Sequence, residues 1–382
     1  MVVYYQRNAR KNEICGRLMK GDSTKELLLN APIKQIFLLR HRDLDEMAAV
    51  SLMEKKAKAV INAEPFMSGK YPNRGPLLLL QAGIPLYQIS NDKFECIPNC
   101  SFVEIREHAI YASGHPPIPC EPFTIDDWQQ TANESKRNLP FQLSRFIDNT
   151  LHYAEKEKHE ILRPLQIPNL NVPMEGRHVV IVVRGSGYKE DLEALKPYIE
   201  YFQPVLIGVD GGADALLEFN YKPSLIVGDM DSVSDEALTC GAEIVVHAFL
   251  NGEAPGLKRV ESLGLAACTV PAAGTSEDLA MLLAYESNAE LIVAVGTHTH
   301  MIDFLEKGRR GMGSTLLVRM KLGPKLVDAK GISKLYQRGF QWNRLIYVPA
   351  AAIFPLAVLS LIHPGFRHMV HTIWIYLKLT LF

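Results

Sequence analysis

Three acidic loops, each directly after a short apolar run, constrain this sequence more than any other feature. The runs cover residues 205–207, 224–227 and 268–270. Apolar runs of this length are typical of buried strands. In an open α/β sheet, the carboxyl ends of the parallel strands form the crevice that holds a ligand. The sequence therefore predicts that carboxylates far apart along the chain meet at one edge of a sheet.

The three loops offer ligands for a nucleotide or another phosphorylated molecule. The candidate binding residues are Asp210, Gly211, Gly212, Gly228, Asp229, Asp231, Ser232, Thr275 and Asp278. Among them Asp229, Asp231 and Asp278 are the candidate metal ligands, because carboxylate oxygens suit a hard cation such as Mg²⁺ that also bridges to phosphate. The alternative for each loop taken singly is that it forms a turn or a helix N-cap and binds no ligand, because Asp and Ser favour both of these structures. A carboxylate at Asp278 would also be stabilised by the dipole of the helix that it opens.

Strand-like and helix-like segments alternate through most of the chain, which predicts α/β domains with parallel sheets. We expect a small N-terminal α/β domain over residues 1–124, in which 1–30 are a loosely structured lead-in. A helical connector and linker follow at 125–173. A doubly wound parallel-sheet domain is expected over 174–338 and a C-terminal membrane-anchor region over 339–382.

The connector is a long polar stretch, residues 125–162, with an apolar stripe at helical spacing. One interpretation is a helix that packs on a single domain and exposes its other face. The alternative is a self-association surface, which would make the protein a homodimer.

A loop at residues 68–76 leads into a short helix that Pro76 would begin and Gly83 would end. A loop that leads into a helix N-terminus can hold an anion. Lys70 and Arg74 would add positive charge, and the site would face a cleft between domains. The alternative is a fixed turn that joins two elements.

Three weaker motifs lie in the second domain. Gly185 and Gly187 resemble part of a dinucleotide fingerprint, but Glu190 occupies the place of its third glycine, so a simple turn is sufficient explanation. His298 and His300 could bind a transition metal or merely form a hydrogen-bonded turn. The pair at residues 309–310, both arginine, could clamp phosphate or lie on a solvated helix.

Composition excludes some classes of protein. Lysine and arginine number 41 against 42 acidic residues, so no overall basic field indicates nucleic-acid binding. The six cysteines lack the paired spacing of a zinc site and are expected to be reduced thiols in cytosol. The first 20 residues have no apolar core of the signal-peptide type.

The C-terminal region contains an uncharged run at residues 345–362, whose 18 residues would form a helix of roughly 27 Å. The prediction is a membrane segment with its basic N-terminal flank in the cytoplasm, which would anchor the protein to the cytoplasmic face of the membrane. An apolar hairpin packed on the globular domain is the alternative. Residues 363–382 would lie flat at the far interface or fold back.

Two stretches carry a resemblance to the catalytic domain of thiamine pyrophosphokinase: the DGGA at 210–213 and the GDMDS at 228–232. In that family aspartates hold Mg²⁺ and ATP, and Asp210, Asp229, Asp231 and Asp278 fall on its acidic positions. The sequence departs from the family at Met281, where a lysine is usual, and lacks the later GGRxDH stretch.

A longer resemblance is to SteA-like septum proteins, which are described as cytokinetic-ring components of Gram-positive bacteria. It is carried by residues 61–63, 68–76, 82–86, 311–315 and 325–330, together with the GDMDS stretch. This resemblance implies work in cell division or the envelope, with division or envelope proteins as partners and a location at the septum.

The sequence thus predicts a membrane-anchored cytoplasmic protein that binds Mg²⁺ and ATP or another nucleotide in a pyrophosphokinase-like domain. One alternative is an enzyme that transfers pyrophosphate from ATP to thiamine. Another is a scaffold whose nucleotide site is vestigial.

Overall fold

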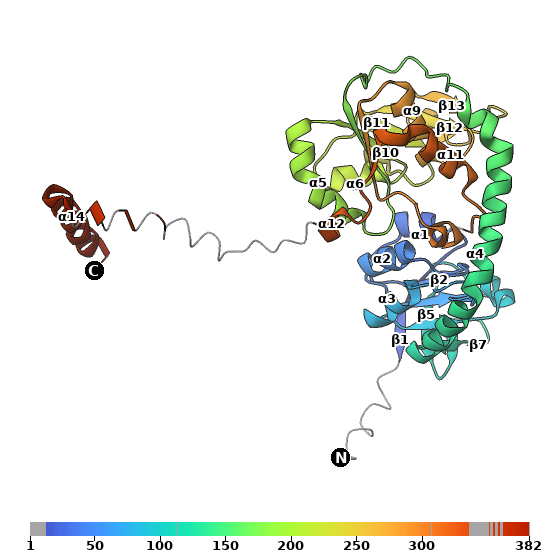
Figure 1. The fold of residues 1–382 in the computed structure, drawn as a ribbon. Helices are drawn as coiled ribbons and strands as arrows, with labels where there is room; N and C mark the ends of the chain where they lie inside the picture. Colours follow the sequence, from blue (N-terminus) through green and yellow to red (C-terminus); the bar gives the residue numbers. More distant parts are fainter. Residues whose placement is uncertain are drawn as a thin grey trace, which may run out of the picture. The chain divides into compact units, whose positions relative to one another are not determined.

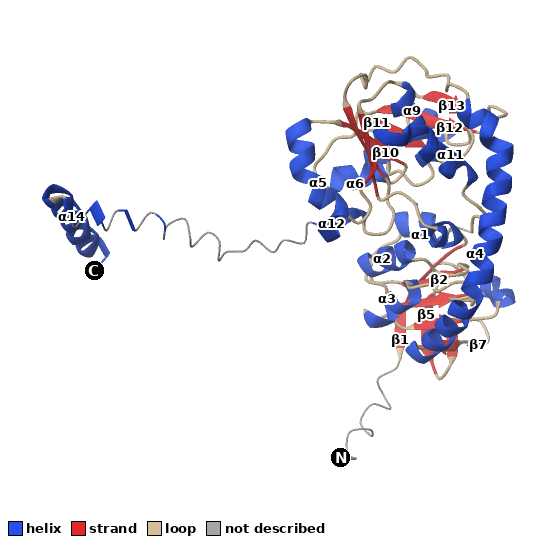
Figure 2. Ribbon diagram, in the orientation of Figure 1, coloured by secondary structure: helices blue, strands red, loops and turns tan. Residues whose placement is uncertain are grey.

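The computed structural model of this protein describes residues 13–112, 114–306 and 308–335, and then residues 351, 354–355, 358–359 and 362–381. They divide into two compact units, one ending at Ile332 and the other beginning at Ser333. The described part of the first unit contains two sheets with helices packed against them (Figure 1, Figure 2). We call residues 14–123 the first lobe and residues 178–328 the second lobe.

The first lobe is built on a mixed sheet with the strand order β7-β6-β5-β1-β2-β3-β4-β8. Strands β1 to β4 pair in parallel, whereas β5 to β7 on one side and β8 on the other pair antiparallel. The elements are β1 (Ile14–Gly21), α1 (Thr24–Asn30), β2 (Ile36–Leu39), α2 (Glu46–Glu54), β3 (Ala59–Asn62), α3 (Gly75–Gln81), β4 (Leu86–Gln88), η1 (Asn91–Cys96), β5 (Phe102–Arg106), β6 (Ala109–Ala112), β7 (Ile118–Pro119) and β8 (Glu121–Phe123).

The prediction of a loosely structured lead-in is wrong for the described residues from 13 onward. Strand β1 lies in the middle of the sheet between β5 and β2, and Ser23 caps α1 by accepting a hydrogen bond from the Glu26 amide. The partners that bury β1 lie far along the chain: Ile14 is opposite Ile105, and Leu18 is opposite Ile36. Local pattern therefore understated how much structure this segment has.

The second lobe contains a fully parallel sheet with the strand order β13-β12-β11-β10-β9-β14-β15. This confirms the predicted mixed α/β architecture with a parallel sheet. The elements are β9 (His178–Val182), α5 (Tyr188–Phe202), β10 (Val205–Val209), α6 (Gly212–Glu218), β11 (Leu225–Gly228), α7 (Asp235–Leu238), β12 (Glu243–Ala248), α8 (Leu257–Ser262), β13 (Cys268–Pro271), α9 (Ser276–Glu286), β14 (Leu291–Val295), α10 (Met301–Glu306), α11 (Gly313–Leu322), η2 (Gly323–Lys325) and β15 (Leu326–Asp328).

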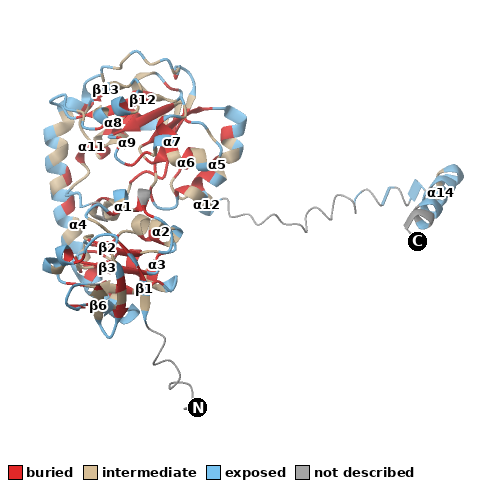
Figure 3. Ribbon diagram, turned by 180° about the vertical axis from the view of Figure 1, so that it is seen from behind, coloured by how far each residue is buried: buried red, intermediate tan, exposed pale blue. Residues whose placement is uncertain are grey.

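Helices cover both faces of this sheet because successive strand residues point to opposite sides. On β9, Val179 and Ile181 pack in the cluster that contains α9 and the end of α11. Val180 and Val182 pack instead against α5 and α6. Figure 3 shows the central strands as buried, which explains why they read as continuous apolar runs rather than alternating ones.

The strand order places a switch point beside β9. From β9 the chain adds β10 to β13 in one direction and then returns to place β14 and β15 on the other side of β9. In sheets of this kind the ligand crevice lies outside the carboxyl ends of the strands at the switch point. The loops after β9, β10, β11 and β14 therefore border one crevice.

Helix α4 (Ile125–Leu162) is a single element of 38 residues with Pro140 inside it, and it contacts both lobes rather than packing on one. Trp128 Nε1 donates a hydrogen bond to the Asn73 carbonyl of the first lobe. Near the other end, Asn149 Nδ2 donates to the Arg310 carbonyl of the second lobe. Figure 1 shows the helix running beside elements of both sheets.

The predicted membrane segment is not supported. Among the described residues, none of the helices combines the length and the apolar character that crossing a bilayer requires. The helix α14 (Pro364–Leu381) has 18 residues, but Arg367 and Lys378 interrupt its apolar positions. Within the run at 345–362, most residues lie outside the described part of the chain. The predictions of a C-terminal anchor and of a location at the cytoplasmic face of the membrane are therefore wrong. The short helix α12 (Ile332–Leu335) precedes this region.

Candidate functional site

Three of the predicted carboxylates meet at the ends of two neighbouring strands. Asp210 follows β10, while Asp229 and Asp231 follow β11, and one oxygen of each lies within 4.8 Å of the others. A Mg²⁺ ion with ligands at about 2.1 Å would bring coordinating oxygens to separations of about 3–4 Å. These carboxylates therefore fit a hard divalent cation after small side-chain movements.

The glycine before the Asp229 loop is needed for this geometry. A Cβ atom at Gly228 would stand 1.8 Å from Oδ1 of Asp210, so only glycine lets that carboxylate lie against the end of β11. Asp210 itself has a φ of 48°, in the left-handed region. Its amide donates to the Val227 carbonyl, and its Oδ1 accepts a bond of 3.3 Å from the Met230 amide. The backbone of β11 thus holds Asp210 in place.

The cluster carries an unequal distribution of charge. Burial, followed by the negative charge of Asp229, raises the pKa of Asp210 to about 7. Burial and then Asp231 raise the pKa of Asp229. Burial also disfavours ionised Asp231, but the hydrogen bond that Lys25 donates, together with the side-chain interaction with Asp229, outweighs it, so the pKa of Asp231 is lowered. Neighbouring carboxylates with raised pKa values indicate a site that gains from a bound cation.

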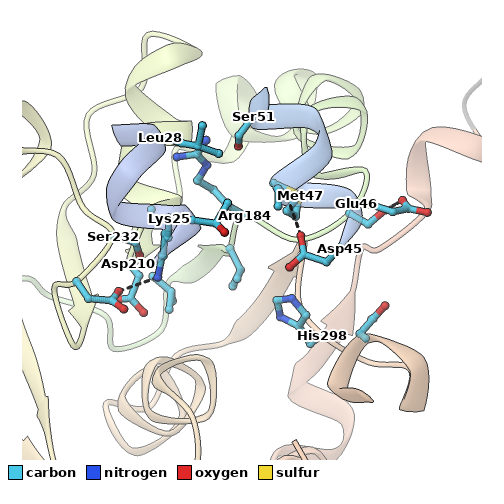
Figure 4. Close-up of a pocket in the computed structure, with 18 of the residues that line it drawn as sticks. Lys25, Leu28, Asp45, Glu46, Met47, Ser51, Arg184, Asp210, Ser232 and His298 are labelled. Atoms are coloured by element: carbon cyan, nitrogen blue, oxygen red, sulfur yellow. Dashed lines mark hydrogen bonds and ion pairs between the residues drawn. The ribbon is translucent and has the colours of Figure 1, made fainter. Parts of the chain in front are cut away.

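A cavity of about 750 Å³ opens beside the cluster (Figure 4). Its walls come from both lobes: helices α1 and α2 of the first, and the loops after β9, β10, β11 and β14 of the second. Pockets of roughly 300–1,000 Å³ hold small molecules and cofactors. The volume is thus sufficient for a nucleotide beside the carboxylates.

Basic side chains face the same cavity. Lys25 Nζ lies 2.7 Å from Asp231 Oδ1, and Arg184, after β9, points across the cavity toward α1 in Figure 4. The Nε of Arg184 is buried and makes no hydrogen bond to the described residues. Arg309, which the sequence offered as a phosphate clamp, also lines the cavity. A cation site next to basic groups matches a metal-bound polyphosphate.

A histidine–glutamate pair forms another wall. His298 Nδ1 and its backbone amide both contact the Glu277 carboxylate. Both side chains are largely buried and both line the cavity. Of the two interpretations of the HxH motif, the structure favours a hydrogen-bonded turn, because the ring of His298 is held by Glu277 instead of joining a metal-binding group of described residues.

Asp278 lies apart from the acidic cluster. It is fully buried, and its Oδ2 accepts hydrogen bonds from the Thr275 amide, Ser314 Oγ and Thr315 Oγ1, each at 3.0 Å. Burial raises the pKa of this carboxyl group. Among the described residues, the carboxylates whose oxygens lie within 4.8 Å of one another are Asp210, Asp229 and Asp231, and Asp278 is not part of that group. Asp278 thus joins the starts of α9 and α11.

Apart from Asp278, the predicted binding residues fall into two groups. Those that line the cavity are Asp210, Gly211, Asp229, Asp231, Ser232 and Thr275. Gly212 and Gly228 lie behind the wall, where they allow close approach of backbones. A Cβ atom at Gly212 would stand 1.9 Å from the Val182 carbonyl oxygen, so glycine lets α6 begin against β9.

Sequence reasoning did not assign Lys25, Arg184 or Glu277 to the site. Lys25 lies in the segment for which the sequence predicts a loosely structured lead-in, and its contact with Asp231 joins residues 206 positions apart. Arg184 follows a strand at the switch point, and that position is a signal that sequence alone could have provided.

The loop at residues 68–76 does not line the cavity. The Ser68 amide donates to Asp43, Asn138 on α4 donates to the Gly69 carbonyl, and the Asn73 side chain accepts from the Gly75 amide. Gly75 is packed so tightly that a Cβ atom would meet the Leu44 carbonyl oxygen at 2.1 Å. Of the two interpretations, the structure favours a fixed turn.

Comparison with known proteins adds two findings. Residues 330–381 match the SteA-like C-terminal domain. The chain is also similar to 6-hydroxymethyl-7,8-dihydropterin pyrophosphokinase of Methanocaldococcus jannaschii, at 28% identity over 158 residues. That alignment covers 38% of this chain and 63% of the relative, so the chain spans somewhat less than two thirds of the relative's length. A pyrophosphokinase-like region and a SteA-like C-terminal region are thereby supported.

Solved structures also align with the chain, one of them over a third of its length. It is the crystal structure of 3-isopropylmalate dehydratase (leuD) from Methanocaldococcus jannaschii, with 13% identity, 33% of this chain and 99% of that chain covered, and a TM-score of 0.21. At that TM-score the likeness supports no inference.

Proposed function

We propose that the second lobe binds a nucleoside polyphosphate together with Mg²⁺ at Asp210, Asp229 and Asp231. The observation that carries this proposal is the gathering of these carboxylates, with oxygens within 4.8 Å, at the ends of adjacent strands beside the switch point. The cation would neutralise phosphate charge, while the protein's own basic groups would contact the remaining oxygens. Similarity to a pyrophosphokinase supports the same assignment.

Calorimetry tests this proposal. Titrating the protein with ATP, GTP and their diphosphates in the presence of Mg²⁺ should show saturable binding to at least one of them. The Asp229→Asn, Asp231→Asn double variant should lose at least about tenfold in affinity, because it removes two charges that hold the cation. If the double variant bound nucleotide as tightly as the unaltered protein, or if the unaltered protein did not bind, this proposal would be rejected. The scaffold interpretation would then stand.

A second candidate is transfer of a pyrophosphoryl group to the hydroxyl of a hydroxyalkyl group on a heterocycle. The oxygen of that hydroxyl would attack the β-phosphorus of ATP and release its proton to solvent. The bond between the β-phosphorus and the oxygen that bridges it to the α-phosphorus would break, and AMP would leave with that oxygen. The name of the relative favours a pterin acceptor, and the resemblance to thiamine pyrophosphokinase favours thiamine. The chain's part is to orient the polyphosphate and the acceptor in the cavity.

Incubation with ATP, Mg²⁺ and either acceptor tests the second candidate. AMP and the diphosphate ester should appear in equal amounts, and the double variant should form neither. If the protein binds nucleotide but forms no ester from either acceptor, the enzyme candidate is rejected for these substrates, and binding alone remains.

The match of residues 330–381 supports a proposal about the cellular process as well. We propose work in cell division or the envelope, with proteins of that machinery as partners. A fluorescent fusion should concentrate at the septum, and deletion of residues 330–382 should reduce that signal. Even fluorescence throughout the division cycle would contradict this proposal.

A further inference from the structure

The first lobe contributes one side chain directly to the acidic cluster. Lys25, which is labelled in Figure 4, lies near the start of α1, and its Nζ reaches Asp231 Oδ1 at 2.7 Å. The three clustered carboxylates all come from the second lobe. The ammonium group therefore stands where a divalent cation's positive charge would be required.

This ion pair contributes little to holding the lobes together. The side chains of Lys25 and Asp231 are 54% and 52% exposed, and exposed pairs of this kind are weak because solvent screens them. The positive charge nevertheless stands beside the cluster, because Nζ lies 2.7 Å from Asp231 and the three carboxylates have oxygens within 4.8 Å of one another. A solvent-exposed ion pair of this kind can exchange one partner for another.

We infer that Lys25 is an exchangeable counter-ion: it neutralises the carboxylates when no cation is bound and turns to a phosphate group when a metal–nucleotide complex enters. The inference rests on the proposed function. A divalent cation and an ammonium group would compete for Asp231, and the incoming polyphosphate supplies a new negative partner within the same cavity. The flexible stem of lysine allows such a change of partner.

A second basic group marks where the phosphates would lie. Arg184 lines the same cavity, and its buried Nε makes no hydrogen bond within the described part of the chain. The guanidinium could contact phosphate oxygens without losing an ion pair, and Lys25 would approach them from the facing lobe. The polyphosphate would then be held between lobes, which gives the first lobe a direct part in nucleotide binding.

Binding of Mn²⁺ alone and binding of ATP in saturating Mg²⁺ should respond to Lys25→Met in opposite directions. Without the competing ammonium group, Mn²⁺ alone should bind about three- to tenfold more tightly. Without its phosphate contact, ATP with Mg²⁺ should bind about five- to twentyfold more weakly. Electron paramagnetic resonance of free Mn²⁺ and calorimetry with ATP measure the two constants on the full chain.

Lys189→Met is the matched control. Lys189 Nζ makes another exposed ion pair between the lobes, at 2.9 Å from Glu54, but does not line the cavity. Both affinities should stay within about twofold of the unaltered protein's. Lys25→Arg, which keeps the charge, should restore nucleotide affinity to within about threefold.

The outcomes separate the inference from the proposed function. If the unaltered protein binds neither Mn²⁺ nor ATP, the proposed function fails. If it binds both but Lys25→Met leaves both affinities unchanged, or shifts them in the same direction, the counter-ion role of Lys25 is overturned while nucleotide binding stands. An equal effect of Lys189→Met would show that lobe contact, not local charge, is responsible, and would also overturn it.

Discussion

Asp210 is the carboxylate of this site whose ionised form is strongly disfavoured by its surroundings. It is held behind Gly228 by the backbone of β11, and its pKa is raised to about 7 chiefly by burial. The folded chain therefore keeps a proton on this carboxyl over a pH range in which the unfolded chain, with an ordinary pKa near 3.8, has lost it. Because the folded state binds more protons there, stability falls as pH rises from about 4 to 7.

Asp210→Asn should remove this dependence. Relative to the unaltered protein, the variant's free energy of unfolding should rise between pH 4.5 and pH 7.5, by roughly 1–3 kcal/mol. Urea unfolding in the absence of divalent cations, at several pH values, measures the difference. If the unfolding free energies of the two proteins changed with pH in parallel, burial would not raise the pKa of Asp210.

We expect substitution of Asp278 to lower the free energy of unfolding more than it lowers cation affinity. Asp278→Ala would leave the Thr275 amide and the hydroxyls of Ser314 and Thr315 without their shared acceptor, at a cost of about 2–4 kcal/mol in unfolding free energy. Asp229→Ala, at an exposed position, should cost less than about 0.5 kcal/mol. Urea unfolding compares the two.

The same carboxylate permits a test of the metal assignment made from sequence. Since Asp278 lies outside the cluster of three, a folded Asp278→Asn variant should keep Mn²⁺ affinity within about threefold. A loss as large as that of Asp229→Asn would instead make Asp278 a ligand.

At the scale of elements, the contact between the end of β11 and the loop after β10 decides whether a cation site exists. Gly228→Ala would put a methyl group 1.8 Å from the present position of Asp210 Oδ1. The carboxylate must move, so Mn²⁺ affinity should fall at least about tenfold and unfolding free energy by about 1–3 kcal/mol.

Gly264→Ala controls for the general cost of adding a Cβ atom. Its φ is 70°, but nothing lies within 4 Å of the added atom. The substitution should cost about 1–2 kcal/mol of backbone strain and leave Mn²⁺ affinity unchanged. Similar affinity losses in both variants would remove the special role of Gly228.

At the scale of the whole molecule, every residue that lines the cavity lies between Thr24 and Arg309. These residues all belong to the compact unit that ends at Ile332. A chain that ends after Leu335 should therefore bind Mn²⁺ and ATP within about twofold of the full chain. A tenfold loss in calorimetry would place part of the site in the C-terminal region.

The sequence also misled at this scale. An uncharged run at 345–362 suggested a membrane helix, yet none of the helices among the described residues is long and apolar enough to span a bilayer. Arg367 and Lys378 in α14 break the apolar pattern of the helix that follows.

By itself, the sequence determined that carboxylates follow the apolar runs before Asp210, Asp229 and Asp278, and that those runs alternate with helices as in a parallel sheet. Such features are readable because strand burial and loop chemistry are local. Only the tertiary structure decided which carboxylates meet: β10 and β11 are neighbours, whereas β12 separates β13 from them. It also brought Lys25 to Asp231 across 206 positions of sequence. Strand order and lobe contact depend on packing between distant segments, which local pattern does not encode.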